Sequence, residues 1–196
     1  MDGLKDITQE EELELKEIRI HGRGGQGVVT AAELLAVAAF EDGKYAQAFP
    51  SFGSERMGAP VQSFVRIADQ KVRARNQILF PDYLIIQDAT LIGAIDVTKG
   101  LKPNGMVIVD TDKKPEELKL NTKAKVVTLP ATKIAMEILG RPIQNTTLVG
   151  AFAGATGLIS VEAIKKSVRH RFPGEVGEKN AKAIQTAYDL MKGEAK

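Results

Sequence analysis

A glycine-rich segment carries the sharpest chemical signal in the sequence: His21-Gly22-Arg23-Gly24-Gly25-Gln26-Gly27-Val28. Gly22, Gly24 and Gly27 satisfy the G-x-G-x-x-G spacing, and a short strand pattern at 17–21 precedes them. Glycines at a strand-to-helix junction let backbone amides approach an anion at the N-terminus of the next helix. The same glycines could also serve only a tight turn and close helix packing. A motif of this kind therefore predicts an anion site without establishing one.

A second group of polar residues lies in the loop from Phe49 to Pro60, which follows the next expected strand at the edge of the sheet where ligands usually bind. Ser51 and Ser54 offer hydroxyl groups, Glu55 a carboxylate and Arg56 a guanidinium group that suits phosphate. These residue types favour recognition of a polar ligand. The alternative is a solvated loop in which the two charges are merely exposed.

The sequence disfavours a stand-alone NAD-dependent dehydrogenase. Such an enzyme needs an acidic residue at the end of the second strand, about 20 residues after the glycine motif, to bind the ribose hydroxyls. Here that strand ends in Gln47-Ala48-Phe49-Pro50, while Glu41 and Asp42 come earlier, at the expected end of the helix. A P-loop is excluded as well, because the glycines are not followed by Lys and Ser or Thr.

The composition argues against several further kinds of binding site. The chain has no cysteine, so it cannot ligate an iron–sulfur cluster through thiolate, and its two histidines have no metal-site spacing. The 27 basic residues nearly balance 25 acidic ones and are dispersed, which argues against nucleic-acid binding. No signal peptide or membrane-spanning apolar run is evident, so we expect a cytoplasmic protein without membrane contact.

The elements that must position these residues alternate between strand and helix patterns. We expect one domain over 1–196, with a flexible N-terminal segment at 1–15. Strands are predicted at 44–49, 61–67, 83–86, 106–109 and 125–129, with 71–75 as a hairpin partner of the second of these, and helices at 28–40, 90–98 and 131–139, with three more after Pro142. The fold class is α/β: a Rossmann-like, doubly wound, mostly parallel sheet with an antiparallel edge hairpin and a helical C-terminal part.

Several of these segments together resemble one known family. The resemblance covers about residues 17–190, and the ordered combination is far more specific than the glycine motif alone. The chain is similar to the gamma subunit of pyruvate:ferredoxin oxidoreductases and related 2-oxoacid oxidoreductases. The resembling segments are 21–28, 49–60, Gln62-Ser63-Phe64-Val65-Arg66-Ile67, Asn145-Thr146-Thr147-Leu148-Val149-Gly150-Ala151-Phe152, Thr156-Gly157-Leu158-Ile159 and Lys179-Asn180-Ala181-Lys182-Ala183.

The resemblance implies a non-catalytic subunit, inactive alone, of an enzyme that converts a 2-oxoacid and coenzyme A to acyl-CoA and carbon dioxide and passes two electrons to ferredoxin. Thiamine diphosphate and the [4Fe-4S] clusters would belong to partner subunits, alpha, beta and delta or their fused equivalents, and this chain would hold no cofactor firmly. It would cover the entrance of the active site and contact coenzyme A. The residues expected there are Gly24, Gly25, Gln26, Gly27, Ser51, Ser54, Glu55 and Arg56.

Two alternatives to a pyruvate-specific subunit stay open from the sequence. Pyruvate is favoured over a branched-chain 2-oxoacid only by frequency in the family, because the substrate pocket should lie on other chains. A free-standing nucleotide-binding protein that uses the same glycine turn belongs to a different class.

Overall fold

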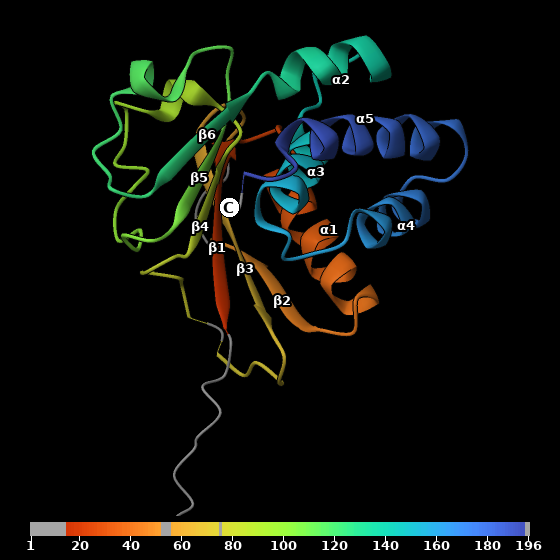
Figure 1. Cartoon of the computed structure of the whole chain (residues 1–196), viewed down its shortest axis with the longest axis horizontal. Helices are drawn as coiled ribbons and strands as arrows, with labels where there is room; N and C mark the ends of the chain where they lie inside the picture. The colour runs from red at the N-terminus through yellow and green to blue at the C-terminus, as the bar shows by residue number, and fades with distance from the viewer. Residues whose placement is uncertain (1–14, 52–55, 75, 195–196) are drawn as a thin grey trace, which may run out of the picture.

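The computed structural model describes residues 15–51, 56–74 and 76–194. Most of the predicted N-terminal segment, together with Ser54 and Glu55, lies outside the described residues. Within the described part of the chain, six strands form one mixed sheet in the order β2-β3-β1-β4-β5-β6 (Figure 1). The strands are β1 (Lys16–Arg23), β2 (Tyr45–Pro50), β3 (Pro60–Ala68), β4 (Tyr83–Ile86), β5 (Met106–Asp110) and β6 (Lys125–Leu129). The strand pattern at 17–21 and the later apolar runs predicted the parallel strands β1, β4, β5 and β6 to within a few residues.

The antiparallel part of the sheet differs in detail from the expected hairpin. Strand β3 pairs antiparallel with β2 on one side and with β1 on the other, while 71–74 contains no strand. The antiparallel edge pair is therefore confirmed, but β2 takes the place of 71–75. Residues Ser63 to Ala68 are all buried, which suits a strand with neighbours on both sides, whereas Lys71 and Arg73 are charged and exposed. Strands β1 and β2 are consequently not neighbours.

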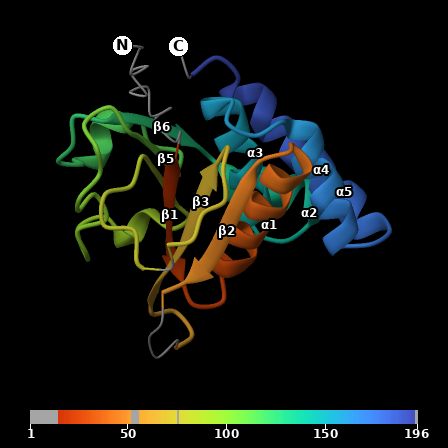
Figure 2. The same cartoon turned by 90° about the horizontal axis from the view of Figure 1, so that it is seen from below.

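The α-helices lie on one side of the sheet (Figures 1 and 2). They are α1 (Val28–Glu41), α2 (Ala131–Leu139), α3 (Asn145–Thr156), α4 (Val161–Arg171) and α5 (Glu175–Met191). The opposite side is covered by loops and the 3-10 helices η1 (Ala89–Leu91) and η2 (Pro115–Leu118). The helix expected at 90–98 is thus only the short η1, followed by turns, because Asp88 and Asp96 hold the chain in local turns through Thr90 and Thr98. The three helices expected after Pro142 are confirmed.

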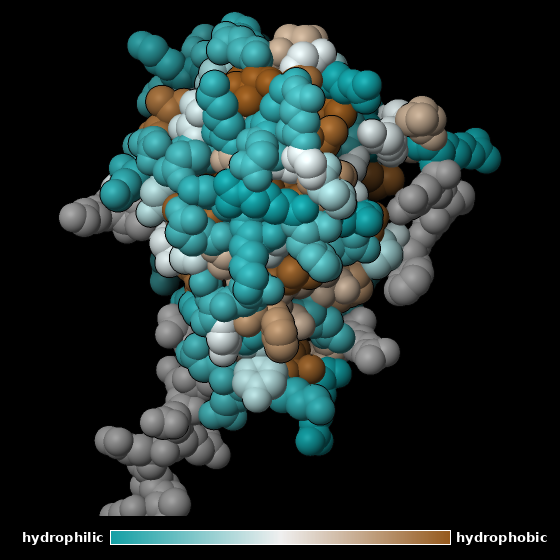
Figure 3. Space-filling model, turned by 90° about the vertical axis from the view of Figure 1, so that its right-hand side faces the viewer, coloured by the Kyte–Doolittle hydropathy of each residue, from teal (hydrophilic) through white to brown (hydrophobic). Residues whose placement is uncertain are grey.

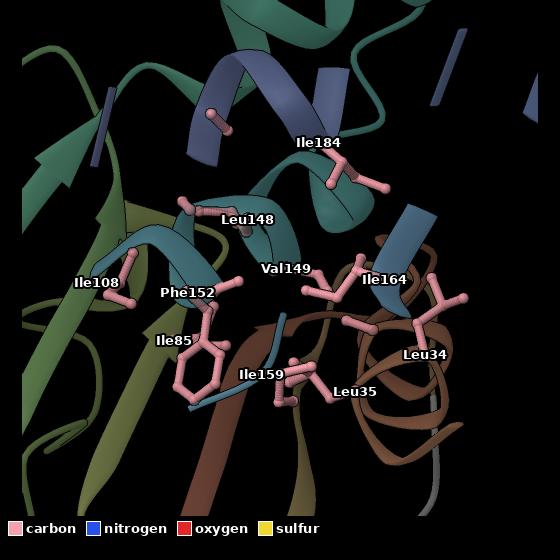
Figure 4. Close-up of a cluster of buried hydrophobic side chains, with 14 of the residues drawn as sticks. Leu34, Leu35, Ile85, Ile108, Leu148, Val149, Phe152, Ile159, Ile164 and Ile184 are labelled. Carbon is pink, nitrogen blue, oxygen red and sulfur yellow. The ribbon is translucent and has the colours of Figure 1, made fainter. Parts of the chain in front are cut away.

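The larger core lies between the sheet and the helices (Figure 4). Helix α3 is buried from Asn145 to Ala155, and it contacts α5 at very short range. A Cβ at Gly150 would lie 2.4 Å from the carbonyl oxygen of Ile184, and one at Gly154 would lie 2.4 Å from that of Tyr188. These glycines therefore serve helix packing. The outer surface of the helical layer is largely hydrophilic (Figure 3).

The topology creates a crevice at the carboxyl ends of β1 and β4. From β1 the chain crosses through α1 toward β2, whereas from β4 it continues in the other direction, to β5. Ligands of open α/β sheets bind where neighbouring strands lead away in opposite directions. The glycine-rich turn follows β1 at this point, and Gln87 and Asp88 follow β4.

Candidate functional site

The glycine-rich turn has a backbone that other residues would not readily adopt. Gly25 has φ 94° and Gly27, the N-cap of α1, has φ 69°, both in the left-handed region. Space is restricted too, since a Cβ at Gly24 would lie 2.3 Å from the carbonyl oxygen of Arg56. Both of the reasons given for the glycines, a tight turn and close packing, therefore hold.

The turn and the loop after β2 are in direct contact. Gly24 donates to the carbonyl of Ala59 at 2.9 Å and accepts from the amide of Gly58 at 3.0 Å, and it forms an isolated bridge with Met57. The structure thereby brings together two segments that the sequence singled out separately. It also occupies the Gly24 amide, which is not free for a ligand.

The predicted residues of the loop have different surroundings. The Ser51 amide donates to the carbonyl of Gln62 at 2.9 Å, and its hydroxyl accepts from Gln77 at 3.5 Å. Arg56 is exposed and contacts the turn through its backbone. Ser54 and Glu55 lie outside the described residues.

A polar network supports the turn from the side of β4. The Arg23 guanidinium donates to Asp88 at 3.1 Å and to Thr90 at 2.8 Å, and the Gln26 side chain donates to Asp88 at 2.9 Å. The carbonyl oxygen of the Gln26 side chain accepts from the Arg23 amide at 2.7 Å. Asp88 and Thr90 were not among the predicted site residues. An acidic residue, Asp88, follows closely after the apolar run at 83–86 in the sequence, but the partners of its side chain could not be inferred from that position.

Asp88 remains ionised in this network. Partial burial raises the pKa of its carboxyl group, but hydrogen bonds from Thr90 and Gln26 and the charge of Arg23 outweigh that effect and hold the pKa below its ordinary value. The carboxylate and the guanidinium neutralise each other, so the crevice contains no unpaired negative charge from Asp88 that would repel an anion.

The N-terminus of α1 opens onto a cavity of about 410 Å³. Among the described residues, no acceptor takes a hydrogen bond from the amides of Gly27, Val28 or Val29. The cavity is lined by Gly25, Gln26, Gly27, Thr132, Pro142, Ile143 and Gln144. Free amides at the positive end of a helix dipole, beside an open cavity, form a suitable place for an anionic group.

Residues at the start of α3 hold this cavity in place. Asn145 donates to the carbonyl of Gly27 at 3.3 Å, and Gln144 donates to the carbonyl of Gln87 at 3.0 Å. A Cβ at Gly27 would lie 2.4 Å from Nδ2 of Asn145, so the glycine is also needed for this contact. The sequence identified Asn145 only through the family resemblance, and the cap position that was expected for it before α3 is taken by Gln144, because the helix itself begins at Asn145.

The described residues contain no cluster of three or more His, Asp or Glu side chains suited to a metal ion. His21 has a structural environment: burial lowers its pKa to about 3, so the imidazole is neutral at ordinary pH.

Within 15–51, 56–74 and 76–194, no helix combines the length and apolar character required to span a membrane.

Comparison with known proteins decides the family. A family model described as pyruvate ferredoxin/flavodoxin oxidoreductase matches residues 17–190. The chain belongs to this family. The pyruvate synthase subunit PorC of Methanosarcina barkeri is 64% identical over 180 residues, which cover 92% of this chain and 99% of that relative. The common subunit gamma of the pyruvate/ketoisovalerate oxidoreductases of Pyrococcus furiosus is 53% identical and covers 88% and 95%, respectively.

Solved structures of the family agree with the fold. The pyruvate oxidoreductase subunit PORC of Thermotoga maritima aligns with a TM-score of 0.80 and 38% identity, over 89% of this chain and 96% of that one. Its similarity confirms the mixed α/β architecture expected for an oxidoreductase gamma subunit. It also agrees with the sequence resemblance, which was assigned from the glycine turn, the loop and the segments around α3 and α5.

Proposed function

We propose that this chain is the gamma subunit of a pyruvate:ferredoxin oxidoreductase. In the reaction, pyruvate and coenzyme A yield acetyl-CoA and carbon dioxide, with loss of one proton and transfer of two electrons to ferredoxin. The observation that carries the proposal is the 64% identity to a pyruvate synthase subunit over 99% of its length. The partners of the chain would be the alpha, beta and delta subunits or their fused equivalents.

The redox and thiamine chemistry belongs, in this proposal, to the partner subunits. The chain has no cysteine, so its residues do not fit an iron–sulfur cluster held by thiolates. Thiamine diphosphate, when bound to a partner, supplies the electron sink for decarboxylation. What this chain contributes is binding and positioning, which makes it a non-catalytic subunit.

The cavity at the N-terminus of α1 is the proposed contact with coenzyme A. The free amides of Gly27, Val28 and Val29 suit a phosphate group, and Gln26, Thr132 and Gln144 add polar side chains around the cavity. Arg56 lies next to the turn, in a loop that is hydrogen-bonded to Gly24. The proposed site therefore includes Gly25, Gln26, Gly27 and Arg56, with Ser51 at the far end of the loop, while Gly24 has a supporting role.

Activity measurements with the isolated chain and the assembled complex test the proposal. We expect no turnover of pyruvate with coenzyme A and a viologen acceptor by the purified chain. A complex reconstituted without it should lose coenzyme A-dependent turnover, and addition of the chain should restore it. Turnover by the chain alone, or full turnover by the complex that lacks it, would contradict the proposal.

A related candidate is a subunit that serves a branched-chain 2-oxoacid as well. The Pyrococcus furiosus relative is named as a subunit common to pyruvate and ketoisovalerate oxidoreductases. A comparison of kcat/KM for pyruvate and for ketoisovalerate over all the complexes that co-purify with the chain separates the two. We expect a preference for pyruvate of about tenfold or more, and an equal or reversed preference would favour the second candidate.

The geometry gives little support to a free-standing dinucleotide-binding protein. In that class the ribose-binding acid stands at the end of the strand next to β1. Here β2 ends at Pro50, and β3 separates it from β1. The end of β2 therefore carries no acidic residue, and it lies one strand further from the glycine turn than in a dinucleotide-binding protein.

A further inference from the structure

A groove of about 560 Å³ lies on the side of the sheet opposite to the helices, around the buried side chain of Arg19. Ile18 and Ile20 face the helical layer, so Arg19 between them points to the other side. The groove, called the Arg19 groove below, is lined by Arg19, Gln62, Phe64, Gln77, Ile78, Leu79, Phe80, Asp96, Lys99 and Gly100. Neither the reaction nor the proposed coenzyme A site uses it.

Within the part of the chain that the structure describes, the Arg19 guanidinium donates only to uncharged acceptors. Its Nε donates to Nε2 of His21 at 3.0 Å, and its Nη2 donates to the carbonyls of Val97 and Lys99 at 3.1 and 2.6 Å. Burial lowers the pKa of Arg19, and the charge of Asp96, which lines the same groove, partly offsets this effect. Oδ1 of Asp96 accepts from the amide and hydroxyl of Thr98, however, and no ion pair with Arg19 is present among the described residues. Arg19 is only 6% exposed, so a positive charge is buried without a carboxylate in contact among the described residues.

Arg66 on β3 provides an internal comparison. It is 2% exposed and faces the same side of the sheet, and it forms an ion pair with Glu17 at 2.8 Å. It also donates to the carbonyls of Ala74 and Asn76. Burying an unpaired charge is costly, and a buried arginine normally has an anionic partner. Arg19 has the carbonyl contacts of Arg66 but no carboxylate in direct contact, which leaves its exposed edge in the groove open to an anion from another molecule.

The rim of the groove is apolar and exposed. Leu79 and Phe80 are consecutive, and each is 63% exposed, while Ile78 before them is buried and anchors the segment. Gly100 has φ 76°, and a Cβ there would lie 2.0 Å from the carbonyl oxygen of Leu79. Close contact between the two loops therefore fixes the rim. Large apolar side chains that project from a fixed rim are typical of protein–protein contacts.

We propose that the Arg19 groove binds an acidic segment of a partner subunit, with a carboxylate directed at Arg19 and Lys99 and apolar residues on Leu79 and Phe80. The charged residues that line the groove are two cations, Arg19 and Lys99, and one anion, Asp96. The groove therefore has a net positive charge, which complements an acidic segment. A small anion inside the groove would leave Leu79 and Phe80 in water, whereas a protein segment covers them. This inference rests on the proposed function, because it requires that the chain assembles with partner subunits.

Association of the chain with its purified partner subunits tests the groove. Phe80→Ser and Lys99→Glu change exposed side chains, and we expect each to weaken assembly about tenfold or more, as at an interface hot spot. Phe40→Ser and Lys182→Glu are matched controls on exposed parts of α1 and α5, and we expect them to change the dissociation constant less than about twofold. Normal assembly of both groove variants overturns the inference, whereas failure of the wild-type chain to assemble at all contradicts the proposed function instead.

A photo-cross-linking experiment in the assembled complex identifies the occupant. With p-benzoylphenylalanine in place of Phe80, we expect a cross-link to a partner-subunit peptide that contains Asp or Glu. The same probe in place of Phe40 should give no cross-link to that peptide. Cross-links from position 80 that stay within this chain overturn the inference. So does binding of benzoate in the groove of the isolated chain, if the partner subunits then assemble without contacting the groove.

Discussion

Asp88 connects strand β4 to the glycine turn, because it accepts hydrogen bonds from both Arg23 and Gln26. Its second oxygen accepts from the amide and hydroxyl of Thr90 at 2.9 and 2.5 Å. One carboxylate thus fixes the start of η1 and the conformation of the turn. The charge of this residue should therefore affect stability even though its role is not catalytic.

We predict that Asp88→Asn lowers the free energy of unfolding at pH 7 by about 1 kcal/mol, since charged hydrogen bonds contribute up to about 3 kcal/mol and partial exposure reduces that figure. The folded-state pKa of Asp88 is lower than its unfolded-state pKa, so its stabilising effect is present above the unfolded value, about 4, and is lost as pH falls through the folded value. Urea unfolding between pH 7 and pH 2 measures this. The difference between wild type and variant should disappear at low pH; a constant difference would mean that the charge is irrelevant.

Among the predicted residues that the structure describes, Arg56 has an exposed side chain that can reach a ligand. We expect Arg56→Ala in the assembled complex to raise the KM for coenzyme A by about 10- to 150-fold, which corresponds to the loss of a charge-assisted contact of about 1.5–3 kcal/mol. The KM for pyruvate should not change, because decarboxylation precedes the coenzyme A step. Arg73→Ala, an exposed arginine elsewhere, is the control. Equal changes in both constants would assign Arg56 a structural role.

At the scale of elements, local patterns predicted much of the fold, but not how its strands pair. The apolar runs at 83–86, 106–109 and 125–129 lie in parallel strands of the structure, since buried parallel strands are apolar throughout. The position of β3 between β1 and β2 could not be inferred, because strand order depends on contacts that no local pattern contains. The same limit applies to the site: Gln26 and Asp88 are 62 residues apart in sequence.

Because α3 and α5 are in close contact, we expect a glycine-to-alanine substitution in α3 to change the free energy of unfolding in the unusual direction. Replacing glycine by alanine inside a helix normally stabilises it by up to about 1 kcal/mol. At Gly150 the new Cβ would lie 2.4 Å from a backbone oxygen of α5, so we expect Gly150→Ala to destabilise the chain by about 1–3 kcal/mol. Urea unfolding measures the change, with Lys182→Ala on the exposed face of α5 as control. A neutral or stabilising effect would show that the two helices can separate without cost.

At the scale of the whole molecule, one hydrogen bond joins the Arg19 groove to the end of β2, from which the loop of the proposed ligand site starts. Gln77 lines the groove and donates to the hydroxyl of Ser51, where the loop near the glycine turn begins. The core of the chain lies between the helices and the sheet, while the crevice at the carboxyl ends of β1 and β4 stays open. The core is thus made by this chain alone, and partner subunits are needed only for its exposed surfaces in the proposed complex.

The open α1 N-terminus should be detectable in the isolated chain. We expect phosphate to raise the thermal midpoint more than chloride at equal ionic strength, because phosphate carries more charge and its separate oxygens can each accept from a different amide. At a concentration ten times the dissociation constant the stabilisation would be about 1.4 kcal/mol, or roughly 3–6 °C for a domain of this size. Amide NMR shifts locate the effect, and we expect the largest shifts at Gly27, Val28 and Val29. Equal midpoints in the two salts, or shifts confined to exposed lysines, would return the glycines to a purely structural role.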